Sequence, residues 1–487
     1  MKPRTFMLMG TGSDVGKSLV AAGLCRAYAN RGLKVMPFKP QNMSNNAAVT
    51  GDGGEIGRAQ ALQARAARQV STVHMNPVLL KPETATGAQV IVQGKRAATM
   101  TARDFFKNRQ QFMPAIMESF HEISRQADLV IVEGAGSPAE VNLRDGDLAN
   151  MGFAHAADIP AFLVGDIHRG GVIASIVGTL AVLSPEDKSR LKGFIINKFH
   201  GDPKLFEAGR TYIENTTHLP CLGVIPYFAT ARNLPAEDAV ALEESLASHS
   251  GSYKIAVLRL PRIANFDDFD PLRLETGVSV RFLELGEAIP GDTRLVIIPG
   301  SKSTIPDLAA LRAAGWDIDL QAHVRRGGRV LGLCGGYQML GVRIHDPQGL
   351  EGMAGSVDGL GLLDIETTLV ADKTLTRVAA THVATGHSIA GYEIHLGTSH
   401  GADCARPFAR IGNQDDGATS PNGLVSGTYI HGCFAGDEFR RNYLLSLGAE
   451  ASDLVFESLI ESTLDALAEH LEHHLNLDQL LELAGPA

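Results

Sequence analysis

Short apolar runs that alternate with helical stretches constrain the fold of this chain more than any other feature. In a first series the apolar runs lie at 5–10, 34–39, 129–136, 159–167 and 193–199, and a helical pattern begins at residue 17. Strands that are apolar throughout and are separated by helices are typical of a parallel sheet covered on both faces. A further run at 221–227 is expected to add an edge strand.

A second series of the same kind follows a polar segment at about 228–253. Its apolar runs lie at 254–260, 278–284, 294–300 and 329–334, with a helical pattern at 304–315. A chain of 487 residues is also too long for one hydrophobic core. We therefore predict an α/β protein of two domains, each an open, mostly parallel sheet with helices on both faces. The predicted boundaries are 1–235 for the first domain, 236–252 for a linker, 253–448 for the second domain and 449–487 for a C-terminal helical segment.

Composition excludes several classes of function. The formal net charge of −10 disfavours sequence-independent binding of nucleic acid, which requires a basic surface. No apolar run reaches the roughly 20 residues of a membrane span, and the first ten residues lack the apolar stretch of a signal peptide. The five cysteines show neither a CxxC pair nor zinc-ligand spacing. We expect a cytoplasmic protein with no nucleic-acid or membrane partner, and we assign no oligomeric state.

The first series contains a phosphate-binding loop. GTGSDVGKS follows an apolar strand and opens a helix, which is the context that such a loop requires. Its backbone N–H groups and the helix N-terminus favour phosphate, the lysine reaches the outer phosphates, and the serine hydroxyl can ligate Mg²⁺. Thr11 stands where the strict motif has glycine, so we interpret the loop as a variant. The predicted nucleotide-binding residues are Gly10, Thr11, Gly12, Gly16, Lys17 and Ser18.

Two charged residues end neighbouring apolar runs of this predicted sheet. Glu133 ends the strand-like LVIVE, and Lys39 follows KVMPF. Ligands bind at the carboxyl edge of open α/β sheets, so both side chains are expected near the phosphates. Glu133 is a candidate Mg²⁺ ligand, together with Ser18, and Lys39 is a candidate partner for phosphate and for a substrate carboxylate.

The second series contains a candidate nucleophile. Cys334 lies between Gly332 and Gly336 where an apolar strand gives way to a helix, the geometry in which a sharp turn exposes a nucleophilic side chain. A helix N-terminus also favours thiolate. His431, at the end of a strand-like run, is the candidate base, and the loop with Gly300 is expected to supply a backbone N–H to an oxyanion.

These strings together resemble the glutamine-dependent cobyric acid synthases of cobalamin biosynthesis. GTGSDVGKS and VEGAGS are similar to dethiobiotin synthetase-like enzymes, and LGLCGGYQMLG is similar to class I glutamine amidotransferases. QNMSNN, EGAGSPAEVNLRDGDLANMG, VGDIHRGG and YEIHLG narrow the resemblance to the cobyric acid enzymes. The resemblance implies ATP- and glutamine-dependent amidation of the b, d, e and g carboxylates of adenosylcobyrinic acid a,c-diamide, with Mg²⁺ as cofactor and a corrinoid as substrate.

The resemblance also implies roles for further residues. It places Asp147 and Asn142 near the reacting carboxylate, Gln41 and Asn42 at the substrate, and Asn197 at the adenine. Glu55 is a further candidate Mg²⁺ ligand. For Asp147 and Asn142 the alternative interpretation is loop capping.

The sequence departs from the amidotransferase pattern at one place. The usual His-x-Glu is here His431-Gly432-Cys433, so the carboxylate that orients the base is missing from that triplet. We expect a backbone carbonyl or another side chain, such as His395, to orient His431.

Three other functions fit parts of the chain. They are a cobyrinic acid a,c-diamide synthase, an amidotransferase of the same group that acts on cell-wall lipid intermediates, and a partitioning-type ATPase switch. The acidic charge and the absence of a basic or amphipathic C-terminal helix from the sequence pattern disfavour the switch.

Overall fold

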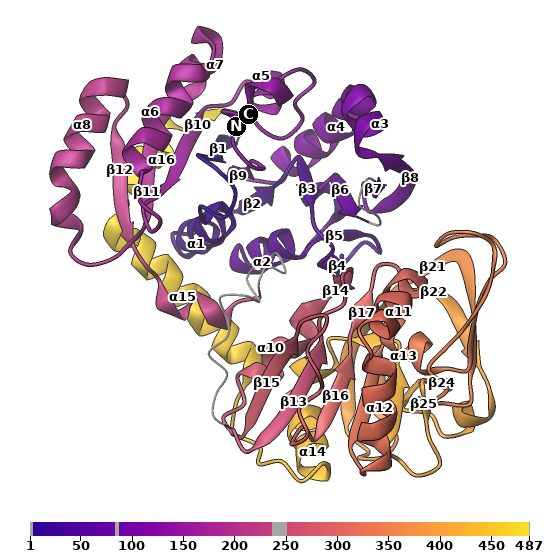
Figure 1. Ribbon diagram of the computed structural model, residues 1–487. Helices are drawn as coiled ribbons and strands as arrows, with labels where there is room; N and C mark the ends of the chain where they lie inside the picture. The colour runs from indigo at the N-terminus through magenta and orange to yellow at the C-terminus, as the bar shows by residue number, and fades with distance from the viewer. Residues whose placement is uncertain (1–2, 83–86, 236–250, 487) are drawn as a thin grey trace. The chain divides into compact units, whose positions relative to one another are not determined.

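The computed structural model describes residues 3–82, 87–235 and 251–486, which form two compact units (Figure 1). The first unit comprises Met1–Ser44, Thr50–Glu237 and Ile460–Ala487, and the second comprises Asn45–Val49 and Asp238–Leu459. Most of the predicted linker at 236–252 lies outside the described residues.

A parallel sheet forms the centre of the first unit, as predicted. Its strand order is β12-β11-β10-β1-β9-β2, and each neighbouring pair is parallel. The run at 221–227 forms the edge strand that we expected. The strands are β1 (Arg4–Gly10), β2 (Val35–Phe38), β9 (Leu129–Glu133), β10 (Ala161–Asp166), β11 (Leu191–Phe199) and β12 (Cys221–Pro226).

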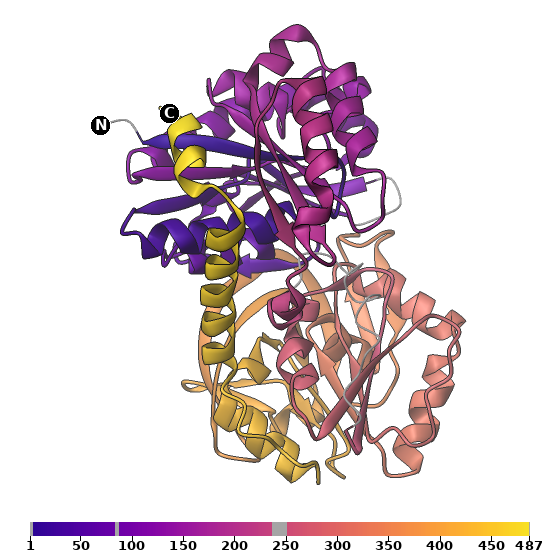
Figure 2. The ribbon, with the colours of Figure 1, turned by 90° about the vertical axis from the view of Figure 1, so that its left-hand side faces the viewer.

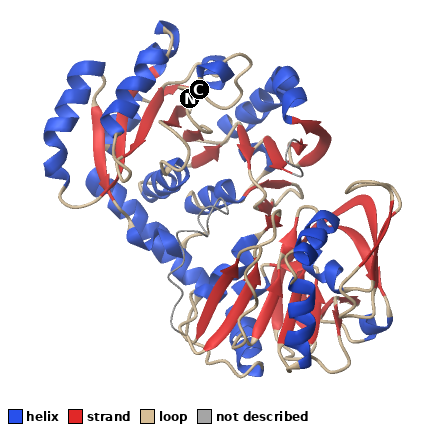
Figure 3. Cartoon of the chain, viewed as in Figure 1, coloured by secondary structure: helices blue, strands red, loops and turns tan. Residues whose placement is uncertain are grey.

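Helices cover this sheet (Figure 3). Helix α1 packs against β1 and β9, α2 against α1 and β2, α4 against β2 and β9, and α6 against β10. Apolar side chains such as Met7, Val130 and Leu163 form the core between them. The helices are α1 (Lys17–Asn30), α2 (Arg58–Ala66), α3 (Ala102–Asn108), α4 (Met113–Ser124), α5 (Met151–Ala156), α6 (Val172–Val182), α7 (Pro185–Arg190) and α8 (Glu207–Thr217).

A small mixed sheet in the first unit was not predicted. Its order is β3-β6-β7-β8, with β3 and β6 parallel and the other pairs antiparallel. Its strands are β3 (Gln41–Met43), β6 (Val78–Pro82), β7 (Gly87–Val92) and β8 (Lys95–Thr101). No described helix of either unit is both long and apolar enough to cross a membrane.

The C-terminal segment forms helices α15 (Phe456–His474) and α16 (Leu477–Leu483) and the short strand β28 (Gly485–Pro486). From Ile460 onward this segment belongs to the first unit. Strand β28 pairs antiparallel with β1, and the Tyr28 hydroxyl of α1 donates to the Leu477 carbonyl at 2.7 Å. Figure 2 shows α16, at the yellow end of the colour scale, beside the indigo β1. The segment therefore completes the core of the first unit.

The second unit has a six-stranded sheet in the order β15-β13-β16-β18-β26-β25, in which all pairs except β25 and β26 are parallel. Its strands are β13 (Tyr253–Leu258), β15 (Val278–Leu283), β16 (Leu295–Ile298), β18 (Arg329–Leu333), β25 (Ala418–Thr419) and β26 (Val425–Thr428). The helices of this unit are α10 (Asp270–Arg273), α11 (Thr304–Ala313), α12 (Trp316–Arg325), α13 (Gly335–Leu340) and α14 (Asp437–Ser446).

A second, mainly antiparallel sheet follows in the order β20-β19-β21-β22-β27. Its strands are β19 (Arg343–Asp346), β20 (Gly355–Asp358), β21 (Glu366–His382), β22 (Ser388–His400) and β27 (Ile430–His431). The later part of the second series is thus richer in strand than in helix, as its sequence indicates. This sheet brings β22 next to the strand that carries His431.

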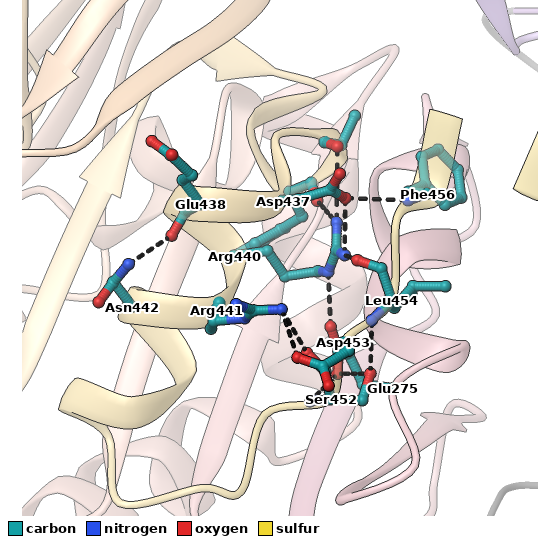
Figure 4. A network of polar contacts seen from close by, with 12 residues as sticks. Glu275, Asp437, Glu438, Arg440, Arg441, Asn442, Ser452, Asp453, Leu454 and Phe456 are labelled. Atoms are coloured by element: carbon teal, nitrogen blue, oxygen red, sulfur yellow. Dashed lines mark hydrogen bonds and ion pairs between the residues drawn. The ribbon is translucent and has the colours of Figure 1, made fainter. Parts of the chain in front are cut away.

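A buried arginine fixes the end of the second unit (Figure 4). The Arg440 guanidinium donates to the Glu275 carboxylate at 2.7 Å, to Asp437 at 2.9 Å and to the Leu454 carbonyl at 2.8 Å. Glu275 in turn accepts the Ser452 N–H at 2.9 Å, and Asp437 accepts the Phe456 N–H at 2.9 Å. The network therefore fixes the chain that leads into α15.

Candidate active sites

The phosphate-binding loop of the first unit connects β1 and α1. Gly16 has a φ of 90°, and a side chain there would come within 2.4 Å of the Asn197 amide nitrogen, so only glycine fits. The Lys17 ammonium, which is buried, donates to the carbonyls of Gly12 at 3.0 Å and Gly136 at 3.1 Å. The loop thus bends around the lysine that is predicted to meet the outer phosphates.

Glu133 lies at the centre of the polar contacts beside this loop. It ends β9, is 1% exposed, and accepts hydrogen bonds from the Ser18 hydroxyl at 2.7 Å and the Lys39 ammonium at 2.8 Å. The structure therefore brings together the three residues that the sequence placed at the carboxyl edge of the sheet. The charged pair is buried, so its attraction is only weakly screened by water.

Two glutamines of α2 complete this arrangement and were not predicted. The second Glu133 oxygen accepts from the Gln63 amide at 2.6 Å and from the Gln60 amide at 3.3 Å. Gln60 also accepts the Asn42 amide at 2.9 Å. The spacing of these glutamines by three residues places them on one face of α2, and the sequence offers no other signal of their role.

The donor set suits a magnesium ion bound largely through water. No group of three or more histidine, cysteine, aspartate or glutamate side chains that could hold a metal occurs in the described parts of the chain. Mg²⁺ commonly keeps several waters and takes only one or two protein oxygens beside phosphates. Ser18 and Glu133 supply such oxygens next to the loop.

The other predicted residues of the first unit have varied environments. Asn197 is buried and donates to the Val15 carbonyl at 2.8 Å, so it supports the loop from below. Glu55 is buried and forms an ion pair with Lys81 at 3.0 Å. Gln41 lies on β3, and Asn142 is exposed in a short 3-10 helix at Val141–Leu143. The metal and substrate roles of these residues stay predictions.

Asp147 caps a turn. Its carboxylate accepts the backbone N–H groups of Ala149 at 2.9 Å, Asn150 at 3.1 Å and Gly152 at 3.0 Å, at the start of α5. These contacts are the ones expected if Asp147 caps a loop. They explain an acidic residue at this position without a catalytic role. A place near the reacting carboxylate stays a prediction.

In the second unit, Cys334 occupies the sharp turn between β18 and α13. Its φ of 51° and ψ of −108° lie in a region that non-glycine residues rarely adopt. Such strain is a feature of nucleophile turns, where it directs the side chain away from both flanking elements. The Cys334 thiol donates to the Ile394 carbonyl of β22 at 3.5 Å, and β22 pairs with the strand that carries His431, so the structure brings the predicted thiol and base to the same region.

Asp268 orients His431. Its carboxylate accepts the His431 Nδ1–H at 2.7 Å and the Gly432 N–H at 2.6 Å, and both Asp268 and His431 are about 1% exposed. Burial alone lowers the pKa of His431, but the negative charges of Asp268 and Cys334 outweigh it and raise that pKa. The arrangement favours the imidazolium form of His431.

We expected a backbone carbonyl or another side chain to orient the base, and the side chain that does so is Asp268 rather than our example, His395. Its Nδ1 contacts the Gly397 carbonyl at 3.1 Å, and its ring stacks on Tyr429 with 3.8 Å between the ring centroids. The residue that stacks on His431 is Tyr392, at 5.4 Å. The sequence signal for Asp268 was the acidic NFDDFD at 265–270, which follows the apolar run at 254–260 after four residues.

Gly300 lies beside the imidazole. A Cβ at this position would come within 2.9 Å of the His431 Cε1 atom, so a side chain would displace the base. The loop that we expected to contribute an oxyanion donor therefore adjoins the imidazole. The donation itself stays a prediction.

A cysteine on a sharp strand-to-helix turn, an imidazole oriented by a carboxylate and a phosphate-binding loop, all on one chain, are the groups expected of an enzyme that combines amide hydrolysis with nucleotide binding. Two family models agree. Residues 6–241 match the CobQ/CobB/MinD/ParA nucleotide binding domain, and residues 254–439 match the CobB/CobQ-like glutamine amidotransferase domain. The chain is a glutamine-dependent amidotransferase with an ATP-binding domain.

Curated relatives specify the family over the full length. A cobyric acid synthase of Bradyrhizobium diazoefficiens is 59% identical over 481 residues, which cover 99% of each chain. Those of Cereibacter sphaeroides and Paracoccus denitrificans are 58% and 59% identical over 478 residues, which cover 98% of this chain and 99% of each relative. The chain belongs to the cobyric acid synthase family.

Proposed function

We propose that this protein amidates the b, d, e and g carboxylates of adenosylcobyrinic acid a,c-diamide, with glutamine as nitrogen donor and ATP as energy source. The observation that carries the proposal is the buried His431–Asp268 pair near the Cys334 turn, in a chain that matches a cobyric acid synthase over 99% of its length. The five cysteines are free thiols, which fits a reducing cytoplasm.

The second unit releases ammonia. The Cys334 thiolate attacks the side-chain amide carbon of glutamine, and His431 gives its proton to the departing nitrogen. Water then hydrolyses the thioester, and His431 takes a proton from that water. Glutamate leaves, and Cys334 and His431 return to their starting states. Asp268 stays ionised and stabilises the imidazolium.

The first unit activates the carboxylate of the corrinoid. A carboxylate is a poor electrophile, and transfer of the γ-phosphoryl group of ATP gives it a leaving group that ammonia displaces. Lys17 and the loop N–H groups offset the negative charge of the phosphates. Lys39, which lies beside Glu133, offsets negative charge of the phosphate and of the substrate carboxylate. Ser18 and Glu133 would hold Mg²⁺, which supplies further charge neutralisation when bound.

Substitution of the thiol tests this division. Cys334→Ser is expected to abolish glutamine-dependent amidation and to leave ammonia-dependent amidation intact, since the first unit keeps its residues. Lys17→Ala is expected to remove amidation with either nitrogen source. The measurement is the formation of corrinoid amides with glutamine or with high ammonium chloride.

Cys404→Ser is the matched control, because this half-buried thiol lies in the same unit and should tolerate the same change. Loss of both activities in Cys334→Ser, with Cys404→Ser active, would refute the assignment of the two half-reactions.

A further inference from the structure

A buried carboxylate that contacts neither Cys334 nor His431 in the described structure is hydrogen-bonded to the segment that precedes His431. Asp416 ends β24 (Gln414–Asp416), is 6% exposed, and uses both oxygens. Its Oδ2 accepts the Thr428 hydroxyl, and its Oδ1 accepts the Tyr429 N–H at 3.2 Å. The carboxylate therefore fixes two consecutive residues at the end of β26.

The segment that Asp416 fixes carries His431 and is hydrogen-bonded to the turn of Cys334. The backbone N–H of Cys334 donates to the Thr428 carbonyl at 2.8 Å, so the strained turn is tied to this residue. The Thr428 hydroxyl also accepts the Ile430 N–H at 3.0 Å, and His431 follows directly. A shift of Thr428 would thus move the thiol and the imidazole together.

The charge state of Asp416 affects these bonds. An ionised carboxylate accepts both hydrogen bonds, whereas a protonated one turns an acceptor into a donor. Burial raises the pKa of Asp416 to about 6, the bonds from Thr428 and Tyr429 oppose this rise, and the charge of Glu393 adds to it. The titratable groups that interact with Asp416 are Glu393, His395, Tyr337, Tyr429, Cys404 and Cys433.

The geometry points to Asp416 as a positioning residue for glutamine hydrolysis, which acts through Thr428 to hold Cys334 and His431 in register. This role rests on the glutaminase function proposed above. Catalytic alignment is sensitive to small displacements, and a misplacement of about 1 Å can cost on the order of 100-fold in rate. Asp416 touches neither reacting group, so it acts only through the segment.

Three variants test the role in the full-length enzyme. Asp416→Asn and Thr428→Val are expected to lower kcat for glutamine hydrolysis by about 10- to 100-fold, with KM for glutamine changed by less than about twofold. Thr428→Ser keeps the hydroxyl and is expected to stay close to the parent. Asp415→Asn is the matched control, because Asp415 is an exposed neighbour paired with Arg410.

Two readouts separate positioning from a loss of folding. The rate at which iodoacetamide alkylates Cys334 should fall in Asp416→Asn while near-ultraviolet circular dichroism stays that of the parent. The kcat of the parent should decline below a pH of about 6, and this acid limb should be absent from Asp416→Asn, which has no carboxyl to protonate.

The role is overturned if Asp416→Asn has the kcat, alkylation rate and pH profile of Asp415→Asn. It is also overturned if Thr428→Ser is as impaired as Thr428→Val. If the parent protein shows no Cys334-dependent glutamine hydrolysis, the proposed glutaminase function itself is refuted.

Discussion

At the residue scale, the catalytic pair depends on a carboxylate that is remote in sequence. Asp268 lies 163 positions before His431 and accepts from both its imidazole and the next backbone N–H. A carboxylate in this position fixes the tautomer of the base and stabilises its charged form. The missing acid of the His-x-Glu triplet is thus replaced from a different element.

Asp268→Asn is therefore expected to lower the rate of glutamine hydrolysis by about 100-fold or more, while ammonia-dependent amidation is unchanged. Steady-state assays with each nitrogen source measure both. Asp292→Asn, the same change at an exposed carboxylate of this unit, serves as control. Equal glutaminase rates in the two variants would show that Asp268 does not orient the base.

The ion pair of His431 and Asp268 predicts that the stability of the protein depends on pH. The pKa of His431 is raised to about 10, so the folded state holds this proton more tightly than the unfolded state, where histidine has a pKa of about 6.5. The contribution of the pair to the free energy of unfolding is then complete below a pH of about 6.5, and it is lost as the pH rises to about 10. The difference in melting temperature between the parent and Asp268→Asn should shrink over this interval; a constant difference would contradict the coupling.

The sequence indicated the candidate site residues but not the side chains that contact them. Cys334, His431, Lys17, Ser18 and Glu133 each stand at a motif or a strand end, where local pattern carries information. Asp268, Gln60 and Gln63 act through tertiary contacts that span 70 or more residues. Spacing in one sequence contains no information on such pairs.

At the element scale, apolar runs predicted the parallel strands of both sheets closely, because a strand buried on both faces must be apolar throughout. The pattern of α15 predicted a helix but not which core it joins, since an apolar face fits any core. The contact of α15 with helix α1 shows why α15 joins the core of the first unit. A Cβ at Gly23 would lie 2.5 Å from Leu471 Cδ1 and 2.9 Å from Leu467 Cγ, so α1 and α15 pack closely there.

Gly23→Ala is expected to destabilise the first unit by about 1–3 kcal/mol through overpacking, although alanine favours helix by up to about 1 kcal/mol. Gly178→Ala on α6 is the matched control, because its added methyl group meets no atom within 4 Å. It is expected to be neutral or stabilising. Denaturant unfolding of the full chain measures both variants, and a Gly23→Ala protein as stable as Gly178→Ala would refute this packing.

At the scale of the whole molecule, one chain contains two chemistries that neither unit completes by itself. The second unit has the thiol that we propose as the source of nitrogen, and it matches the amidotransferase family model. The first has the loop, Lys39 and Glu133, which suit activation of a carboxylate. The match to a cobyric acid synthase covers both units, which supports the view that both act together in one protein.

The central claim is that nitrogen released at Cys334 becomes the amide nitrogen of a carboxylate activated beside Lys17. Amide-¹⁵N glutamine, ATP and the a,c-diamide substrate test it directly, with mass spectrometry of the corrinoid. Each new amide should carry ¹⁵N and so be about one mass unit heavier than the product of unlabelled glutamine, and neither Cys334→Ser nor Lys17→Ala should form it. Glutamine hydrolysis that leaves the corrinoid unchanged, or label in the product of Cys334→Ser, would contradict the account.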